Sequence, residues 1–165
     1  PWPGLEKLRG EVVRGRGRMK AGYTIPGGFV PENNVYEVEL NFKFDRNDAP
    51  FGLDLCVGEG RRLPVRFDPS TDTFTVDRTN CADVEIEKFP MTKSEVIATD
   101  GENLHMRIFV DQSSVEIFLE EGHHSFSFLT YPSENQCGLE FYSEGKGPRC
   151  SYKIWPLESI WKKID

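Results

Sequence analysis

The sequence predicts an all-β fold, an antiparallel sandwich of two β-sheets. Three observations predict it. Apolar and polar residues alternate with a period of two along most of the chain, Gly, Pro, Asn and Asp interrupt these runs at short intervals, and helical periodicity is almost absent. The 165 residues are enough for one domain, with 12 Phe, 5 Tyr and 3 Trp as core material. Many short strands separated by turn signals are typical of a sandwich.

The start of the chain differs in character from the rest. Residues 1–12 begin with the Pro-rich PWPG, and we expect a linker that enters the domain from something upstream. Residues 13–165 are then expected to form a single β-sandwich domain. LEKLR (5–9) and LESIWKK (157–163) are the only segments able to form a helical turn or two. The basic segment at residues 9–22 is short and Gly-rich, and we interpret it as a solvated strand or loop.

The clearest strand is predicted at residues 35–44, where Tyr36, Val38, Leu40 and Phe42 alternate with polar residues. FGLDLCVG (51–58) repeats the alternation, and strands at 63–67 and 73–76 flank a turn with the sequence DPSTD. Later strands are predicted at residues 104–110, 115–119, 124–131, 137–143 and 150–155. Together they indicate a jelly-roll or concanavalin-like sandwich.

Composition excludes several classes of partner and cofactor. The net charge is −7, and no segment combines clustered Lys and Arg with interleaved aromatic residues, so we expect no nucleic-acid partner. No apolar run reaches the ~18 residues of a membrane span. Four cysteines, Cys56, Cys81, Cys137 and Cys150, contain no C-x-x-C pair, which disfavours zinc; isolated thiols are favoured and disulfides stay open. No phosphate-binding Gly loop or hydrolase triad is present, so no cofactor is expected.

The stretch RIFVDQSSVEIFLEEG (107–122) predicts a β-hairpin. With a tight turn at residues 111–114, Val110 faces Val115. One face is then wholly apolar, and the other is mixed, with Phe109 and Phe118 among polar residues. The apolar face consists of Leu104, Met106, Ile108, Val110, Val115, Ile117 and Leu119. Asp111 then caps the turn by accepting backbone N–H groups of Ser113 or Ser114, and Glu116 lies diagonal to Arg107, within reach of an ion pair. This structural interpretation is favoured over the alternative, in which the two carboxylates are the acid and nucleophile of a glycosidase.

Two further features are candidates for contact with a sugar or another domain. Asp77 and Arg78 place a carboxylate beside a guanidinium, a pair that can bind vicinal hydroxyls, but surface polarity at a strand end is the favoured interpretation. Trp155 can stack on a sugar, but anchoring of the last strand is the favoured interpretation. His123 and His124 lack further ligands at metal spacing, so no metal site is expected.

The hairpin sequence resembles the signature of the C-terminal β-sandwich of glycoside hydrolase family 32, the invertases, inulinases and levanases. That signature reads V-D-x-S-x-V-E-x-F and ends in a Gly turn. Thr130-Tyr131-Pro132, GLEFYSEG and IWPLESIW follow in the order typical of the family, so the resemblance covers essentially the whole chain. Gln112 and Leu129 depart from it, each standing where a basic residue is common. The matching hairpin positions are Val110, Asp111, Ser113, Val115, Glu116, Phe118 and Gly122.

The resemblance implies a function without catalysis in this chain. The family's catalytic motifs, W-M-N-D-P-N-G, R-D-P and E-C, are absent, and RNDAP (46–50) matches only a fragment. The chain is therefore expected to be the module that follows a five-bladed propeller and stabilises or orients it. Alternatives are a fructan-binding module and a dimerisation surface. The residues expected to contact sugar or the neighbouring domain are Asp77, Arg78, Asp111, Ser113, Glu116 and Trp155.

Overall fold

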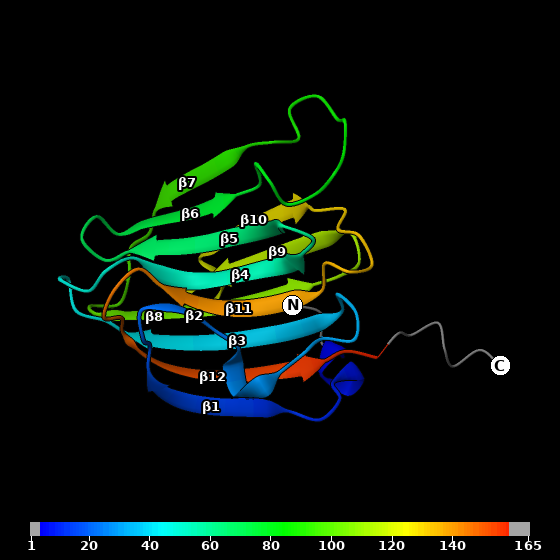
Figure 1. Cartoon of the computed structure of the whole chain (residues 1–165). Helices are drawn as coiled ribbons and strands as arrows, with labels where there is room; N and C mark the ends of the chain where they lie inside the picture. Colours follow the sequence, from blue (N-terminus) through cyan, green and yellow to red (C-terminus); the bar gives the residue numbers. More distant parts are fainter. Residues whose placement is uncertain (1–3, 159–165) are drawn as a thin grey trace.

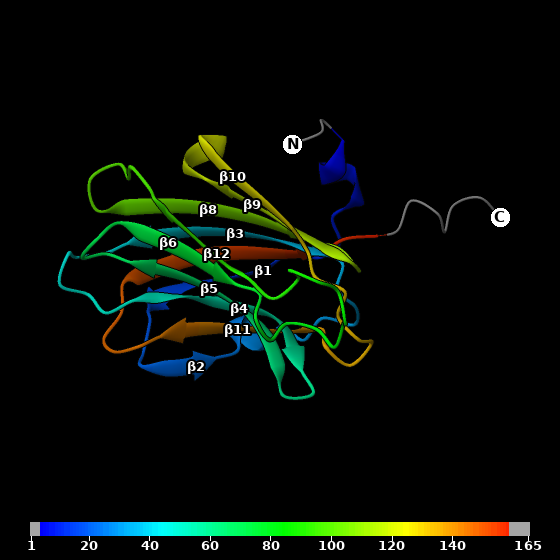
Figure 2. The same cartoon turned by 90° about the horizontal axis from the view of Figure 1, so that it is seen from above.

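The computed structural model describes residues 4–158 and confirms the sandwich, which consists of two six-stranded antiparallel sheets packed face to face (Figures 1 and 2). The first sheet contains β1 (Val13–Arg18), β12 (Arg149–Pro156), β3 (Tyr36–Lys43), β8 (Asn103–Val110), β9 (Ser114–Leu119) and β10 (His124–Leu129), in that order. The second contains β2 (Gly22–Thr24), β11 (Gly138–Ser143), β4 (Phe51–Gly58), β5 (Arg61–Asp68), β6 (Thr73–Asp77) and β7 (Thr92–Val96). Three single-turn 3-10 helices complete it: η1 (Leu5–Leu8), η2 (Pro26–Gly28) and η3 (Glu120–Gly122).

Each predicted strand is present within one or two residues, and the helical turn predicted at residues 5–9 is η1. The turn predicted at 157–163 lies mostly outside the described residues. The sequence did not predict β2 or β7, and it left the segment that forms β1 as a strand or a loop. These three are edge strands; the fourth edge strand, β10, was predicted. Every residue of β7 is exposed, so no apolar alternation marks it. Among the described residues, no helix is long and apolar enough to span a membrane.

The core lies between the sheets and consists of the inward-facing members of the alternating runs. Tyr36, Val38 and Leu40 of β3 are fully buried. Aromatic rings join the two sheets, with the centroids of Phe42 and Phe51 4.8 Å apart. Within the second sheet, Phe67 continues this contact, its centroid 5.7 Å from that of Phe51. Tilted rings at these separations add to the free energy of area burial.

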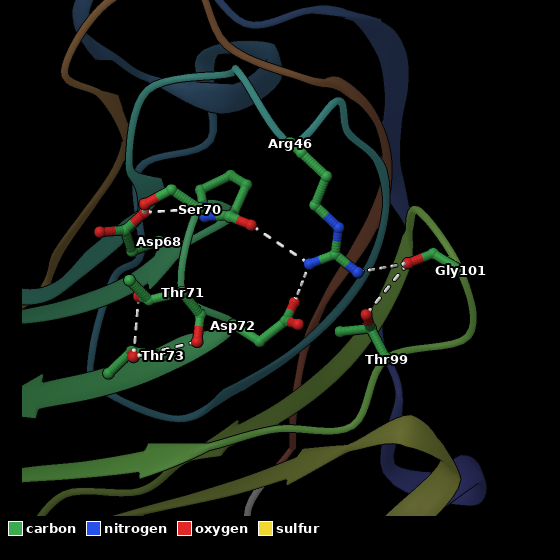
Figure 3. Close-up of polar contacts among 9 residues, drawn as sticks. Arg46, Asp68, Ser70, Thr71, Asp72, Thr73, Thr99 and Gly101 are labelled. Carbon is green, nitrogen blue, oxygen red and sulfur yellow. Dashed lines mark hydrogen bonds and ion pairs between the residues drawn. The ribbon is translucent and has the colours of Figure 1, made fainter.

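Arg46, from the loop between β3 and β4, links loops at one end of the sandwich (Figure 3). Its guanidinium donates to the carbonyl oxygens of Pro69 and Gly101, each at 3.2 Å, and pairs with the Asp72 carboxylate. Three loops distant in sequence are thereby fastened together. In the fragment RNDAP (46–50), Arg46 thus holds loops together.

The four cysteines are free thiols, in agreement with the favoured interpretation. Burial raises the pKa of Cys56 to about 12, that of Cys81 to about 11 and that of Cys150 to about 12. Cys137 is only half-buried. Because the thiolate is the nucleophile, three of the four thiols are poorly reactive in the native fold.

We therefore expect iodoacetamide to alkylate Cys137 alone in the native chain, and all four cysteines after unfolding in guanidinium chloride. Mass spectrometry of tryptic peptides locates the label. Reaction of Cys56 at the rate of Cys137 would contradict the buried environment described above.

Candidate functional site

The hairpin register is as predicted, with Val110 opposite Val115 and Phe109 opposite Glu116. The predicted partners of the two carboxylates are wrong. Asp111 Oδ1 accepts the N–H of Gln112 at 2.7 Å rather than that of Ser113 or Ser114, and the turn closes through a backbone bond from Asp111 N–H to the Ser114 carbonyl.

Arg107 does not reach Glu116 but pairs with Glu37, its Nε donating to Glu37 Oε1 at 2.7 Å. Strand order explains this, because β3 borders β8 on the side opposite β9. Asp111, Ser113 and Glu116 are all exposed to solvent. The carboxylates of Asp111 and Glu116 are therefore not enclosed, whereas a glycosidase uses a pair of carboxyl groups on either side of the bond it cleaves.

Asp77 and Arg78 lie at the end of β6, where both are engaged within the fold. Arg78 Nε donates to the Phe89 carbonyl at 2.8 Å, Nη1 donates to the Leu129 carbonyl at 3.0 Å, and the guanidinium lies over the Phe89 ring. Arg78 thereby ties the loop before β7 to the end of β10. Arg78 reaches the strand beside the hairpin turn, because Leu129 pairs with Ser114. Within residues 4–158, however, neither Asp77 nor Arg78 hydrogen-bonds to Asp111, Ser113 or Glu116.

Asp77 Oδ1 accepts the backbone N–H of Thr79 at 2.9 Å and the Thr92 hydroxyl at 3.3 Å. Partial burial raises the pKa of Asp77, but hydrogen bonds from Thr79 and Thr92 outweigh this and hold it below its ordinary value. A carboxyl with a lowered folded-state pKa stabilises the fold above its unfolded pKa of about 3.9, and this contribution is lost as pH falls through the lower folded value.

Asp77→Asn is accordingly expected to be less stable than the natural chain at neutral pH. On acidification below about pH 4, its stability should fall by less than that of the natural chain, because it has no carboxylate to protonate at this position. Acid titration followed by circular dichroism measures the difference. Asp83→Asn is the matched control, since that side chain is 91% exposed. Parallel acid curves for Asp77→Asn and the natural chain would contradict the prediction.

A buried carboxylate that the sequence did not reveal lies on the outer face of the first sheet. Glu37 of β3 is fully buried although it points away from the core. Arg9 binds it through two bonds, from Nε to Oε2 at 2.9 Å and from Nη2 to Oε1 at 2.8 Å, and Arg107 supplies the third. The Arg9 guanidinium lies 4.0 Å from the centroid of the Trp155 ring, and the hydrogen bond to Glu37 raises the pKa of Arg9.

This Glu37 cluster fastens the start of the chain to the sandwich. Gly10 N–H donates to the Pro156 carbonyl at 2.7 Å, and Glu158 N–H donates to the Leu8 carbonyl at 2.8 Å. Residues 4–10 consequently lie against the first sheet, on the side away from β2 and β11 (Figure 2). Trp155 of β12 contacts this segment through the Arg9 guanidinium, and its role as an anchor or a sugar contact stays a prediction. The domain boundary at residue 12 stays a prediction.

An open groove of about 1430 Å³ lies beside residues 4–10. Its walls come from η1, from the loop around Val30 and from the hairpin turn, so it includes Asp111 and Glu116 among the sequence candidates. Val30 is 73% exposed, a high value for an aliphatic residue. The groove mixes apolar and acidic groups.

A second buried carboxylate, Asp54 of β4, lies on the outer face of the second sheet. Arg62 Nη1 and Arg66 Nη1 each lie 2.6 Å from one of its oxygens, and Arg62 also reaches Glu140 at 3.0 Å. These guanidiniums lie over two aromatic rings, Arg62 over Tyr23 at 4.6 Å and Arg66 over Tyr142 at 4.0 Å. We call Tyr23, Asp54, Arg62, Arg66, Glu140 and Tyr142 the Asp54 patch.

No cluster of three or more His, Cys, Asp or Glu side chains suited to a metal ion occurs within residues 4–158. The two buried carboxylates were hidden from the sequence because each occupies a polar position of an alternating strand. Nothing local distinguishes Glu37 from the half-exposed Glu39. The two buried carboxylates are recognised only from the arginines that bind them in the folded chain.

Comparison with known proteins identifies the chain's family. The family model for the C-terminal region of family 32 glycosyl hydrolases matches residues 5–156. The levanase of Bacillus subtilis is 30% identical over 163 residues, which is 95% of this chain and 24% of the levanase. A levanase from Bacillus sp. strain L7 is 30% identical over 135 residues, 79% of this chain and 15% of that protein.

Solved structures agree on the fold. The exo-inulinase of Aspergillus awamori superposes with a TM-score of 0.84 at 21% identity, covering 95% of this chain and 31% of the inulinase. The chain therefore spans about a quarter of the B. subtilis levanase and about a third of the inulinase. From the family match over residues 5–156 and the shared sandwich, the chain belongs to the C-terminal domain family of the family 32 glycosyl hydrolases.

Proposed function

We propose that this chain is the non-catalytic β-sandwich of a fructan- or sucrose-hydrolysing glycoside hydrolase, and that it packs on the catalytic propeller through the groove beside residues 4–10. The groove is the observation that carries the proposal. It exposes Val30 next to a segment that the Glu37 cluster holds rigidly against the sheet. Two domains joined by such a short, fixed segment have a restricted relative orientation, which favours a specific interface.

The exposed positions of Asp111 and Glu116 support the non-catalytic role. A glycosidase holds its two carboxyl groups on either side of the scissile bond, with one of them kept protonated by its surroundings. The names of the relatives, levanase and sucrose-6-phosphate hydrolase, support a fructan or sucrose substrate for the whole protein. The purified 165-residue chain is expected to release no reducing sugar from sucrose, inulin or levan.

The packing surface is tested by Val30→Asp in the protein that contains both domains. A charge buried in an interface is destabilising, so the melting temperature of the catalytic domain and its activity after heating should fall. Val96→Asp is the matched control, because Val96 is 69% exposed and lies on β7 of the other sheet. Equal behaviour of the two variants would exclude the groove, and turnover by the isolated chain would exclude the non-catalytic role.

The Asp54 patch favours a second function, the binding of fructan. Its two arginines and two carboxylates balance in charge, which suits a neutral sugar. Tyr23 is 51% exposed even with Arg62 over its ring, and we propose that the exposed part of the ring contacts the sugar. Calorimetric titration with levan, inulin and fructose is the test. Binding that Tyr23→Ala abolishes and Tyr131→Ala preserves would support this function, whereas no heat at millimolar sugar would reject it.

A further inference from the structure

A strongly basic surface lies on the outer face of the first sheet, at the edge formed by β1, β12 and β3. Strand register places like charges directly opposite one another: Arg14 faces Lys153, and Arg149 lies between Arg18 and Lys43. We call the set Arg14, Arg16, Arg18, Lys43, Arg149 and Lys153 the basic ladder. All six side chains are exposed.

Few anions lie near the basic ladder. Glu39, opposite Lys153, is the carboxylate within these rows, and its Oε1 lies 3.4 Å from His105 Nε2. Apart from Arg18, which donates to the Gly147 carbonyl, no ladder side chain hydrogen-bonds or forms an ion pair with another described residue. Like charges opposed across strands are destabilising, so an external anion would relieve the repulsion. The chain as a whole carries a net charge of −7, which makes this local excess of cations more pronounced.

The shape of the surface suits a linear ligand. A hollow of about 350 Å³ lies on these strands, and three cations and one carboxylate are among its lining residues: Arg14, Arg16, Lys153 and Glu39. Alternate residues of a strand are about 6.7 Å apart, so the β1 arginines form a regular series of charges. Repeated charges bind a polymer far better than a single ion, because each further contact is intramolecular.

The chemistry of the basic ladder narrows the ligand class. Four of its six cations are arginines, whose planar guanidinium matches phosphate oxygens in two-bond geometry. The aromatic residue among those lining the hollow, Tyr152, is partly buried, so the hollow lacks the fully exposed ring on which the bases of a single-stranded nucleic acid would stack. None of the described residues that line the hollow has an aliphatic side chain of the kind that forms the centre of a protein interface.

We propose that the basic ladder binds a linear phosphodiester polymer without bases, such as a polyol phosphate. The proposal stands independently of the packing groove and of any sugar binding at the Asp54 patch. Binding releases counterions from the polymer, so affinity should fall about tenfold or more between about 50 and 200 mM salt.

The probe is poly(glycerol phosphate), titrated against the 165-residue chain by fluorescence anisotropy. Arg16→Gln/Lys153→Gln should weaken binding about thirtyfold, on the order of fivefold per cation. Lys88→Gln/Lys93→Gln makes the same change in net charge on β7 and the loop before it, and should leave binding within about twofold. Because the ladder substitutions remove repulsion, the variant should melt at or above the temperature of the natural chain.

Three results would overturn the proposal. They are absence of binding at low salt, equal losses in the ladder variant and its control, and equally tight binding of polyglutamate, which would assign the surface to an acidic protein. Weakening in the ladder variant alone, together with a steep dependence on salt, supports it.

Discussion

Replacing Glu37 by Ala is expected to lower the free energy of unfolding by about 3 kcal/mol, because two guanidiniums lose a fully buried carboxylate. We place the effect at the lower end of the range for buried pairs, since Arg9 and Arg107 keep side-chain exposures of 19% and 22%. For a domain of this size the melting temperature should fall by roughly 6–12 °C. Urea unfolding followed by tryptophan fluorescence measures the loss.

Glu39→Ala is the control on the same strand and the same face. Glu39 is 32% exposed and contacts His105, so its loss should cost less than about 1 kcal/mol. Glu37→Ala should also free residues 4–10, seen as faster cleavage in limited proteolysis. If the Glu37 and Glu39 variants unfold alike, the Glu37 cluster does not hold the segment.

Gly52→Ala should be about as damaging, with a loss of about 3 kcal/mol or more. A Cβ atom added at Gly52 would lie 1.9 Å from the Val65 carbonyl oxygen, a backbone atom of the neighbouring strand β5. Backbone cannot rotate away as a side chain can, so β4 and β5 would have to separate. These strands lie inside the second sheet and carry Asp54 and its arginines.

Gly17→Ala is the matched control for Gly52, because a Cβ atom at Gly17 meets nothing within 4 Å. It should change stability by no more than about 0.5 kcal/mol. Chemical denaturation of both variants gives the comparison. A Gly52→Ala chain as stable as the Gly17→Ala chain would show that the close approach of β4 and β5 is readily relaxed.

Much of the fold was predictable because the signals are local. The alternation at residues 35–44 sorts side chains to two faces by backbone geometry alone, and the hairpin has one register that keeps its aliphatic residues on the core face. The strands that escaped prediction, β2 and β7, are edge strands whose hydrogen bonds depend on a neighbour rather than on their own pattern.

The candidate site was much less predictable. Arg107 was assigned to Glu116 because the two lie on neighbouring strands of one hairpin. The structure places a third strand, β3, on the other side of β8 and supplies Glu37 there, in a position more buried than that of Glu116. Asp77 and Arg78 were correctly noticed as polar partners at a strand end, yet both are satisfied by contacts inside the fold.

The sequence by itself determined the class of fold, the hairpin register and, through the hairpin motif, the family. The order of strands in the sheets was decided only in the tertiary structure, and with it every contact between distant charges. That order buries Glu37 and Asp54 beneath arginines, and it assembles the basic ladder from three separate segments of an acidic chain. The physical reason is separation along the sequence. The alternation of side chains depends on residues a few positions apart, whereas the contacts between charged side chains depend on which distant strands become neighbours.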